Sequence, residues 1–137
     1  ELAQPAVTMV IIGRRDVRSN NSWMHNLPIL AKGPQRCTAL VHPDDAARLG
    51  LADGALARIS RAGRSIEAPV QISPDMMPGV VSLPHGWGHD APGAQLRVAA
   101  ERPGANVNAL LDDQRRDPLS GNAVLGGVAI TMQAAVA

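Results

Sequence analysis

The chain has 137 residues, a formal net charge of +1 and 45% hydrophobic residues, a composition typical of one soluble globular domain. It contains two Trp but no Phe or Tyr, so it lacks the aromatic platforms on which single-stranded nucleic acids stack. The near-zero charge also excludes a global basic field, and no apolar run approaches the ~20 residues that span a bilayer. We therefore expect no nucleic-acid or membrane partner and, with no secretory signal visible, a cytoplasmic protein.

Short apolar runs bounded by Gly, Pro or polar turns predict β-strands along most of the chain. The first run, VTMVII, is continuous enough to be a buried strand. Apolar and polar residues alternate on both sides of the turn at 61–64, which predicts a hairpin. The predicted strands cover residues 7–12, 36–41, 55–60, 65–72 and 80–83, and one or two more lie within 123–132.

Residues 43–49 (PDDAARL) give the clearest helix signal. Pro43 suits the first helical position, the two following aspartates lie at the positive end of the helix, and Gly50 can adopt the left-handed conformation of a C-terminal cap. Weaker signals predict a single helical turn at 22–25, with Asn20 or Asn21 as its cap, and a short helix at 106–112.

Six or seven short strands, irregularly spaced and interrupted by two long loops, favour a closed barrel over a sandwich. The fold class is therefore mainly β with one or two short helices. We expect a single domain over residues 1–137, with an ordered core from about 7 to 132. The chain starts at Glu1 rather than Met, which suggests a fragment of a larger protein.

Several kinds of chemistry are missing from the sequence. Cys37 is the only cysteine, so no disulfide or cysteine-based metal site can form, and we expect a buried core thiol. There is no G-x-S-x-G segment and no Walker-type phosphate loop. The acidic pair at 112–113 is followed by the basic pair at 115–116, which predicts a solvated, self-neutralising surface. A self-sufficient enzyme is not visible here.

The most informative segment is the polar loop at residues 13–26, GRRDVRSNNSWMHN. Its clustered Arg14, Arg15 and Arg18 suit phosphate because a guanidinium donates two parallel hydrogen bonds. Its Asn and Ser side chains can donate and accept at the edge of a heterocycle. Trp23, a large aromatic in a polar loop, needs a partner surface. The loop is interpreted as a site for a polyanionic ligand; the alternative is a solvated loop whose arginines only improve solubility.

A second candidate segment is HGWGH at residues 85–89. His85 and His89 have the spacing of two metal ligands on a helix, but the glycines and Pro92 disfavour a helix, and no third ligand is near in sequence. A metal-dependent hydrolase therefore stays a minor hypothesis. Two other readings remain open. The glycines could let backbone N–H groups approach a ligand that the imidazoles and Trp87 line, or the loop could be a structural plug at the barrel end.

The third segment is GANVNALL at residues 104–111. In an extended conformation, Asn106 and Asn108 would point to the same side and could anchor the edge of a ligand. Alternatively, they could cap the short helix that follows.

These segments, in this order, resemble a known family. A strand ends in Gly-Arg-Arg and a Ser/Asn/His loop, and then come five further segments: HPDDAARLGLADG at 42–54, SRAGR at 60–64, PGVVSLPHGWGH at 78–89, GANVNAL at 104–110 and DPLSGNA at 117–123. The chain is similar to the molybdopterin dinucleotide-binding C-terminal domain of the dimethyl sulfoxide reductase family, which includes formate dehydrogenases and nitrate reductases. The resemblance runs from about Val7 to Met132.

The resemblance implies a double-psi β-barrel and a set of cofactor-binding residues. Gly121 and Asn122 fall in the last contact region of the family without an individual role. No catalytic residue and no metal ligand is implied on this chain. The implied cofactor-binding residues are Gly13, Arg14, Arg15, Ser22, Trp23, Met24, His25, His85, Gly86, Trp87, Gly88, His89, Asn106 and Asn108.

The implied ligand is a bis-molybdopterin guanine dinucleotide that carries molybdenum or tungsten and is shared with upstream domains. In such proteins the cofactor supplies the redox chemistry, while the domain supplies binding and orientation. We therefore expect part of an oxidoreductase that is inactive as an isolated domain and partners with upstream domains or a large subunit. The alternative is a double-psi barrel that serves as a protein-interaction module without cofactor, because fold does not settle function.

Overall fold

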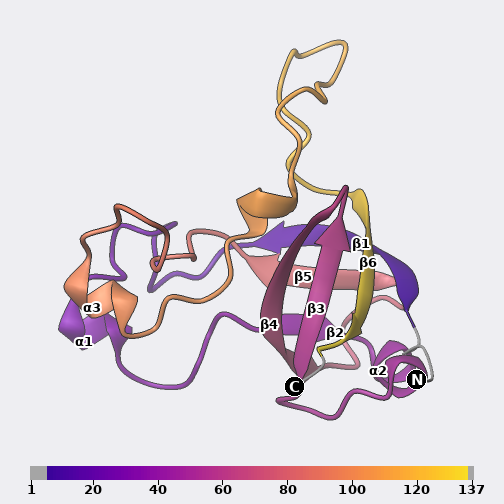
Figure 1. The fold of residues 1–137 in the computed structure, drawn as a ribbon, viewed down its shortest axis with the longest axis horizontal. Coiled ribbons are helices and arrows are strands. Elements are labelled where there is room, and N and C mark those ends of the chain that lie inside the picture. The colour runs from indigo at the N-terminus through magenta and orange to yellow at the C-terminus, as the bar shows by residue number, and fades with distance from the viewer. Residues whose placement is uncertain (1–5, 136–137) are drawn as a thin grey trace.

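The apolar runs of the sequence become the strands of one closed barrel in the computed structural model, which describes residues 6–135 (Figure 1). The predicted strand at 36–41 shortens to three residues, and the first strand extends two residues further because Gly13 and Arg14 pair with Leu83 and Pro84. The strands are β1 (Val7–Arg14), β2 (Ala39–Val41), β3 (Leu56–Arg61), β4 (Arg64–Ile72), β5 (Val80–Pro84) and β6 (Val128–Ala134).

The barrel closes in the order β1-β5-β2-β4-β3-β6. β5 lies between β1 and β2, parallel to the first and antiparallel to the second, while β4 lies between β2 and β3, parallel to β2. The parallel pairs interlock because each inserted strand arrives from a distant part of the chain. Six strands crossed in this way form the double-psi β-barrel, as the resemblance implied.

Aliphatic side chains fill the barrel without help from Phe or Tyr. In β1, Met9 and Ile11 are buried at 1% exposure while Val10 and Ile12 are 37% and 39% exposed. The prediction of a buried first strand therefore holds only for alternate residues, since only alternate residues of a barrel strand face inward. Cys37 is fully buried as predicted, and burial raises the pKa of its thiol.

Helix α2 (Pro43–Leu49) forms where the sequence predicts it, and Gly50 ends it at φ 64°. Asp45 is buried and accepts hydrogen bonds from the backbone N–H of Gly79, at 2.6 Å, and from Arg48. This carboxylate fastens the helix to the turn before β5. No helix in the described part of the chain has the length and apolar character needed to cross a membrane.

Two short helices and one 3-10 turn differ from the prediction. α1 (Pro28–Ala31) and α3 (Arg97–Ala100) have four residues each, too few for a periodic sequence signal. The helix predicted at 106–112 is the 3-10 turn η1 (Val107–Leu110). The turn predicted at 22–25 is present, but Asn20 and Asn21 adopt left-handed φ angles of 42° and 64° instead of capping it.

A lobe stands beside the barrel in Figure 1, made of residues 15–37 with α1 and residues 85–106 with α3. Asn26 ties its two halves together, because its side-chain oxygen accepts hydrogen bonds from the backbone N–H groups of Val98 and Ala99, at 2.9 and 3.2 Å. A second projection, residues 112–123, rises from the barrel between η1 and β6, and we call it the arm.

Candidate functional site

The three loops that the sequence singled out meet in the lobe, and glycines make their contact possible. A Cβ on Gly86, at φ 89°, would overlap the carbonyl oxygen of Asn21, and one on Gly88, at φ 106°, would lie 2.5 Å from the Cβ of Asn106. A Cβ on Gly104 would lie 2.7 Å from the Trp87 ring. The glycines of the second loop therefore allow close contact between the loops. This favours the interpretation of the second loop as a packed plug.

Beneath this contact lies an inner layer of three aromatic side chains, His25, Trp87 and His89. Nδ1 of His25 is 2.6 Å from Nε2 of His89, and the rings of His25 and Trp87 lie 4.0 Å apart between centroids. Both imidazoles are buried. The layer joins the first loop to the second through one hydrogen bond and two ring contacts.

Both imidazoles of this layer are held neutral. Burial lowers the pKa of His25, and the neighbouring His89 imidazole lowers it further. Burial also lowers the pKa of His89, with a smaller opposing effect from the Gly86 carbonyl. When both rings are neutral, one hydrogen between Nδ1 of His25 and Nε2 of His89 satisfies these two facing atoms, whereas protonation of both rings would place two N–H donors face to face.

Two polar atoms of the inner layer have no partner in the described structure: Nε2 of His25 and Nε1 of Trp87. His25 and Trp87 also line a cavity of about 20 Å³, which has room for about one water molecule. Such a space cannot admit a heterocycle. His25, Trp87 and His89 pack against one another and join the first loop to the second.

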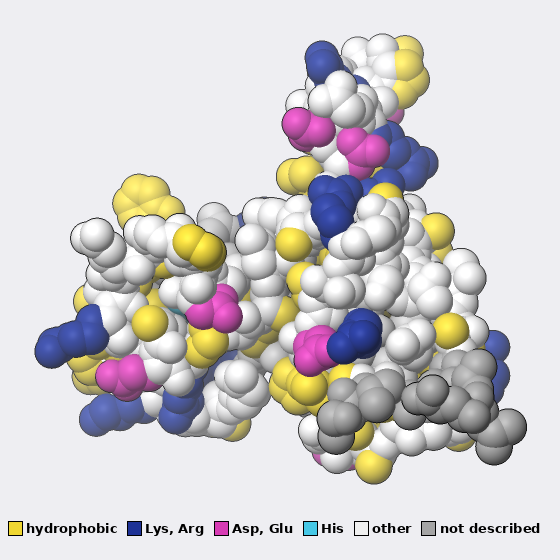
Figure 2. All heavy atoms as spheres, in the orientation of Figure 1, with side chains coloured by type: hydrophobic (Ala, Val, Ile, Leu, Met, Phe, Trp, Pro, Cys, Tyr) yellow, Lys and Arg dark blue, Asp and Glu magenta, His cyan; other side chains and the backbone are white. Residues whose placement is uncertain are grey.

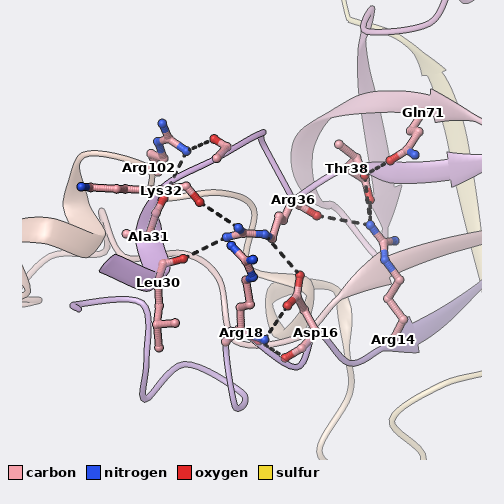
Figure 3. Close-up of polar contacts among 12 residues, drawn as sticks. Arg14, Asp16, Arg18, Leu30, Ala31, Lys32, Arg36, Thr38, Gln71 and Arg102 are labelled. Carbon is pink, nitrogen blue, oxygen red and sulfur yellow. Dashed lines mark hydrogen bonds and ion pairs between the residues drawn. The ribbon is translucent and has the colours of Figure 1, made fainter. Parts of the chain in front are cut away.

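Arg14 turns into the molecule from the end of β1 (Figure 3). Its guanidinium donates to the carbonyl oxygens of Ser82 and Thr38, at 2.6 and 2.8 Å, and to the hydroxyl of Thr38 at 3.0 Å. Burial lowers its pKa. A fourth acceptor is the carbonyl oxygen of Arg36 at 3.3 Å, so this arginine fastens the barrel mouth.

Two arginines that sequence reasoning did not single out hold the lobe in shape. Arg36 donates to the carbonyls of Leu30 and Lys32 at the end of α1 and lies 3.8 Å from the carboxylate of Asp16 (Figure 3). Arg102 reaches the same turn from the other half of the lobe, donating to the carbonyl of Gly33 at 2.5 Å. The contact of Arg102 joins residues 69 positions apart, so no local pattern could have revealed it.

The outer surface of the first loop carries the side chains that remain free for a ligand. Arg15 is exposed and Trp23 is 83% exposed, while Ser22 and Met24 are half-buried. A hollow of about 730 Å³ lies on this surface, and Arg15 and Met24 line it together with Asn20 and Asn21. The hollow is largely open to solvent.

His85 joins the first loop at its start. Its ring lies over Gly13, where a Cβ would overlap Nε2 of the imidazole. Burial lowers the pKa of His85, and the charge of Arg15 lowers it further. His89 instead faces His25, so the two histidines of the second loop have different neighbours. Within residues 6–135, no three His, Cys, Asp or Glu side chains come together as a possible metal site.

The third loop follows the capping alternative. Asn106 is the N-cap of η1, and its side-chain oxygen accepts a hydrogen bond from the backbone N–H of Asn108 at 3.1 Å. Both side chains are exposed. Gly121 and Asn122 lie on the arm, which stands apart from the lobe (Figure 1).

The fold and the loops define a class of protein. It is a double-psi barrel whose long loops are held together by buried contacts and present a polar surface with exposed arginine side chains. The sequence matches the model of the family described as "Molydopterin dinucleotide binding domain" over residues 9–129. The chain belongs to this family. The match spans all three loops of the candidate site.

The chain spans only a small part of the curated relatives that it matches and of one similar solved structure. It is 33% identical over 94 residues to the NADPH-Fe(3+) oxidoreductase subunit alpha of two Geobacter sulfurreducens strains, covering 68% of this chain and 9% of each relative. The structure of acetylene hydratase from Pelobacter acetylenicus aligns with a TM-score of 0.74 at 21% identity, over 93% of this chain and 18% of that one. The structural likeness shows a shared fold.

Proposed function

We propose that this chain binds and orients a bis-molybdopterin guanine dinucleotide, as the C-terminal domain of a molybdenum or tungsten oxidoreductase of the formate dehydrogenase and nitrate reductase type. Family membership supports a molybdopterin-type ligand. The observation that carries the proposal is the outer surface of the first loop, where Trp23 is exposed and where the exposed Arg15 lines a hollow together with Asn20 and Asn21.

The donor chemistry of this surface fits such a cofactor. The guanidinium of Arg15 can take a pyrophosphate oxygen pair, and the ring face of Trp23 can stack on a flat heterocycle. The amides of Asn20 and Asn21 can donate and accept at a pterin or guanine edge. The cofactor would supply the redox chemistry, and this chain would supply one wall of its site.

The inner layer makes this wall rigid. The His25–His89 hydrogen bond and the packing of Gly86 on Asn21 fix the second loop against the first. A site fixed before binding loses less entropy when the ligand arrives. On this account the implied residues divide into exposed groups that touch the cofactor and inner groups, such as the buried His25 and the half-buried Trp87, that hold the exposed groups in place.

The proposal assigns no reaction to this chain alone. The matched relatives carry the names of an oxidoreductase subunit and a hydratase, so the barrel accompanies more than one kind of chemistry. The substrate and the reaction would be set by parts of the parent protein outside this chain, and we expect the isolated chain to be inactive.

The test compares cofactor content in the purified parent protein with Arg15→Ala, Trp23→Ala and the control Arg64→Ala. Arg64 is also an exposed arginine, but it lies in the β3–β4 hairpin. We expect the first two variants to lose most of their pterin and metal by chemical analysis, with the control unchanged and all three retaining the wild-type far-UV circular dichroism spectrum. Full cofactor content in both loop variants would favour the protein-interaction module instead.

A further inference from the structure

The arm is an ordered projection that makes its hydrogen bonds with itself. Arg116 and Ala123 form an antiparallel bridge, and the backbone N–H of Asp117 donates to the carbonyl of Asn122 at 2.8 Å. Among the described residues, the hydrogen bonds of 113–123 all stay within 112–124. Figures 1 and 2 show the arm standing clear of the barrel and the lobe, with hydrophobic surface at its end.

One carboxylate fixes the tip of the arm. Oδ1 of Asp117 accepts hydrogen bonds from the backbone N–H of Ser120 at 2.8 Å, from its hydroxyl at 2.9 Å and from the backbone N–H of Leu119 at 3.2 Å. The bonds from Ser120 and Leu119 lower the pKa of Asp117, so the carboxylate is ionised at neutral pH. This turn holds Leu119 outward at 97% exposure.

A leucine that an ordered turn already holds outward can be buried in a partner without first ordering the turn. Burying one leucine favours a contact by roughly ten- to a hundredfold. Two separate proteins need far more than that, because association costs them their freedom of movement, and a stable interface buries about 800 Å² on each side. A narrow tip cannot supply such an area. The contact is sufficient only if the partner is already tethered on the same polypeptide.

We propose that Leu119 docks into an apolar hollow in the rest of the parent polypeptide and fastens this domain to it. The chain covers 9% and 18% of the matched relatives, so in those proteins most of the polypeptide lies outside the matched region and is available as the partner. This proposal rests on the proposed function only in requiring a longer parent protein. It assigns the arm a mechanical role, separate from the cofactor surface of the first loop.

Limited trypsin digestion of the purified parent protein tests the docking, because Arg115 is exposed on the arm and offers a cleavage site. The variants are Leu119→Ser, the conservative Leu119→Ile, and the matched control Met77→Ser, whose methionine is 70% exposed before β5. We expect Leu119→Ser to raise the cleavage rate after Arg115 at least tenfold. Leu119→Ile and Met77→Ser should stay near the wild-type rate.

Equal cleavage rates after Arg115 in the wild type and in Leu119→Ser would overturn the proposal, because the arm would then be free. Protection that is lost on dilution would also overturn it, because the partner would be a separate molecule. The cofactor content of the same samples tests the proposed function independently. A parent protein without pterin would contradict that function, whereas the cleavage rates would still decide the docking.

Discussion

Gly86 is the position where a single added methyl group should separate the two braced loops. An Ala there must adopt φ near 89°, which costs an L-residue about 1–2 kcal/mol. Its Cβ would also overlap the backbone carbonyl of Asn21, which cannot rotate away as a side chain can. The loops must then move apart, and the His25–His89 hydrogen bond, worth about 0.5–1.5 kcal/mol, is lost with them. We expect Gly86→Ala to lower the free energy of unfolding by about 1.5–3.5 kcal/mol.

Gly93→Ala provides the matched control, because Gly93 has a φ of 87° but nothing within 4 Å of the added Cβ. The free energy of unfolding of Gly93→Ala should fall only by the cost of the left-handed backbone conformation, about 1–2 kcal/mol. The effect of Ala on the unfolded chain is common to both variants and cancels in the comparison. Urea unfolding followed by tryptophan fluorescence measures both values, since Trp87 lies in the contact. Equal losses in the two variants would refute the idea that glycines hold these loops together.

Three further predictions concern neighbouring residues. Arg14→Leu should lower the free energy of unfolding by about 2–3 kcal/mol because it leaves buried acceptors unpaired, whereas Arg15→Ala should change it by less than about 0.5 kcal/mol; equal losses in urea titrations would contradict the division between a buried and an exposed arginine. Because the folded-state pKa values of His25 and His89 are lowered, their contribution is present above the unfolded value near 6.5 and is lost as pH falls below it. The free energy of unfolding should therefore decline from pH 7.5 to pH 5, and it should decline less steeply in His25→Gln. The same slope in that variant as in the wild type would contradict the assignment of this pH dependence to His25. Cys37 should react with a thiol reagent only after unfolding, because it is fully buried and burial raises its pKa; rapid labelling of the native chain would show that the lobe opens.

The strands and α2 could be predicted from sequence because their signals are local. The alternation around 61–64 specifies the hairpin, and Pro43 and Gly50 mark the two ends of the helix. The boundaries of β1 could not be predicted, because the extension to Arg14 depends on pairing with β5, a partner about seventy residues away. Helices of four residues have no period to detect, and α1 and α3 are stabilised by contacts within the lobe.

The candidate site shows the same division between local and distant information. Residue types alone identified the first and second loops, since Arg, Asn, Gly and His in those patterns are unusual in barrel connections. They could not separate Arg14 from Arg15, because two adjacent arginines look alike until the fold turns one inward and leaves the other exposed. Nor could they show that Gly86 packs against Asn21, since that contact joins two distant loops.

Hydrogen–deuterium exchange on the parent protein, with and without its cofactor, tests the central claim most directly. We expect cofactor binding to slow exchange in peptides covering residues 15–26 and 84–90, while peptides of α2 on the far side of the barrel stay unchanged. Protection confined to α2 or to the β3–β4 hairpin, with none in the first loop, would contradict the assignment of that loop as one wall of the cofactor site.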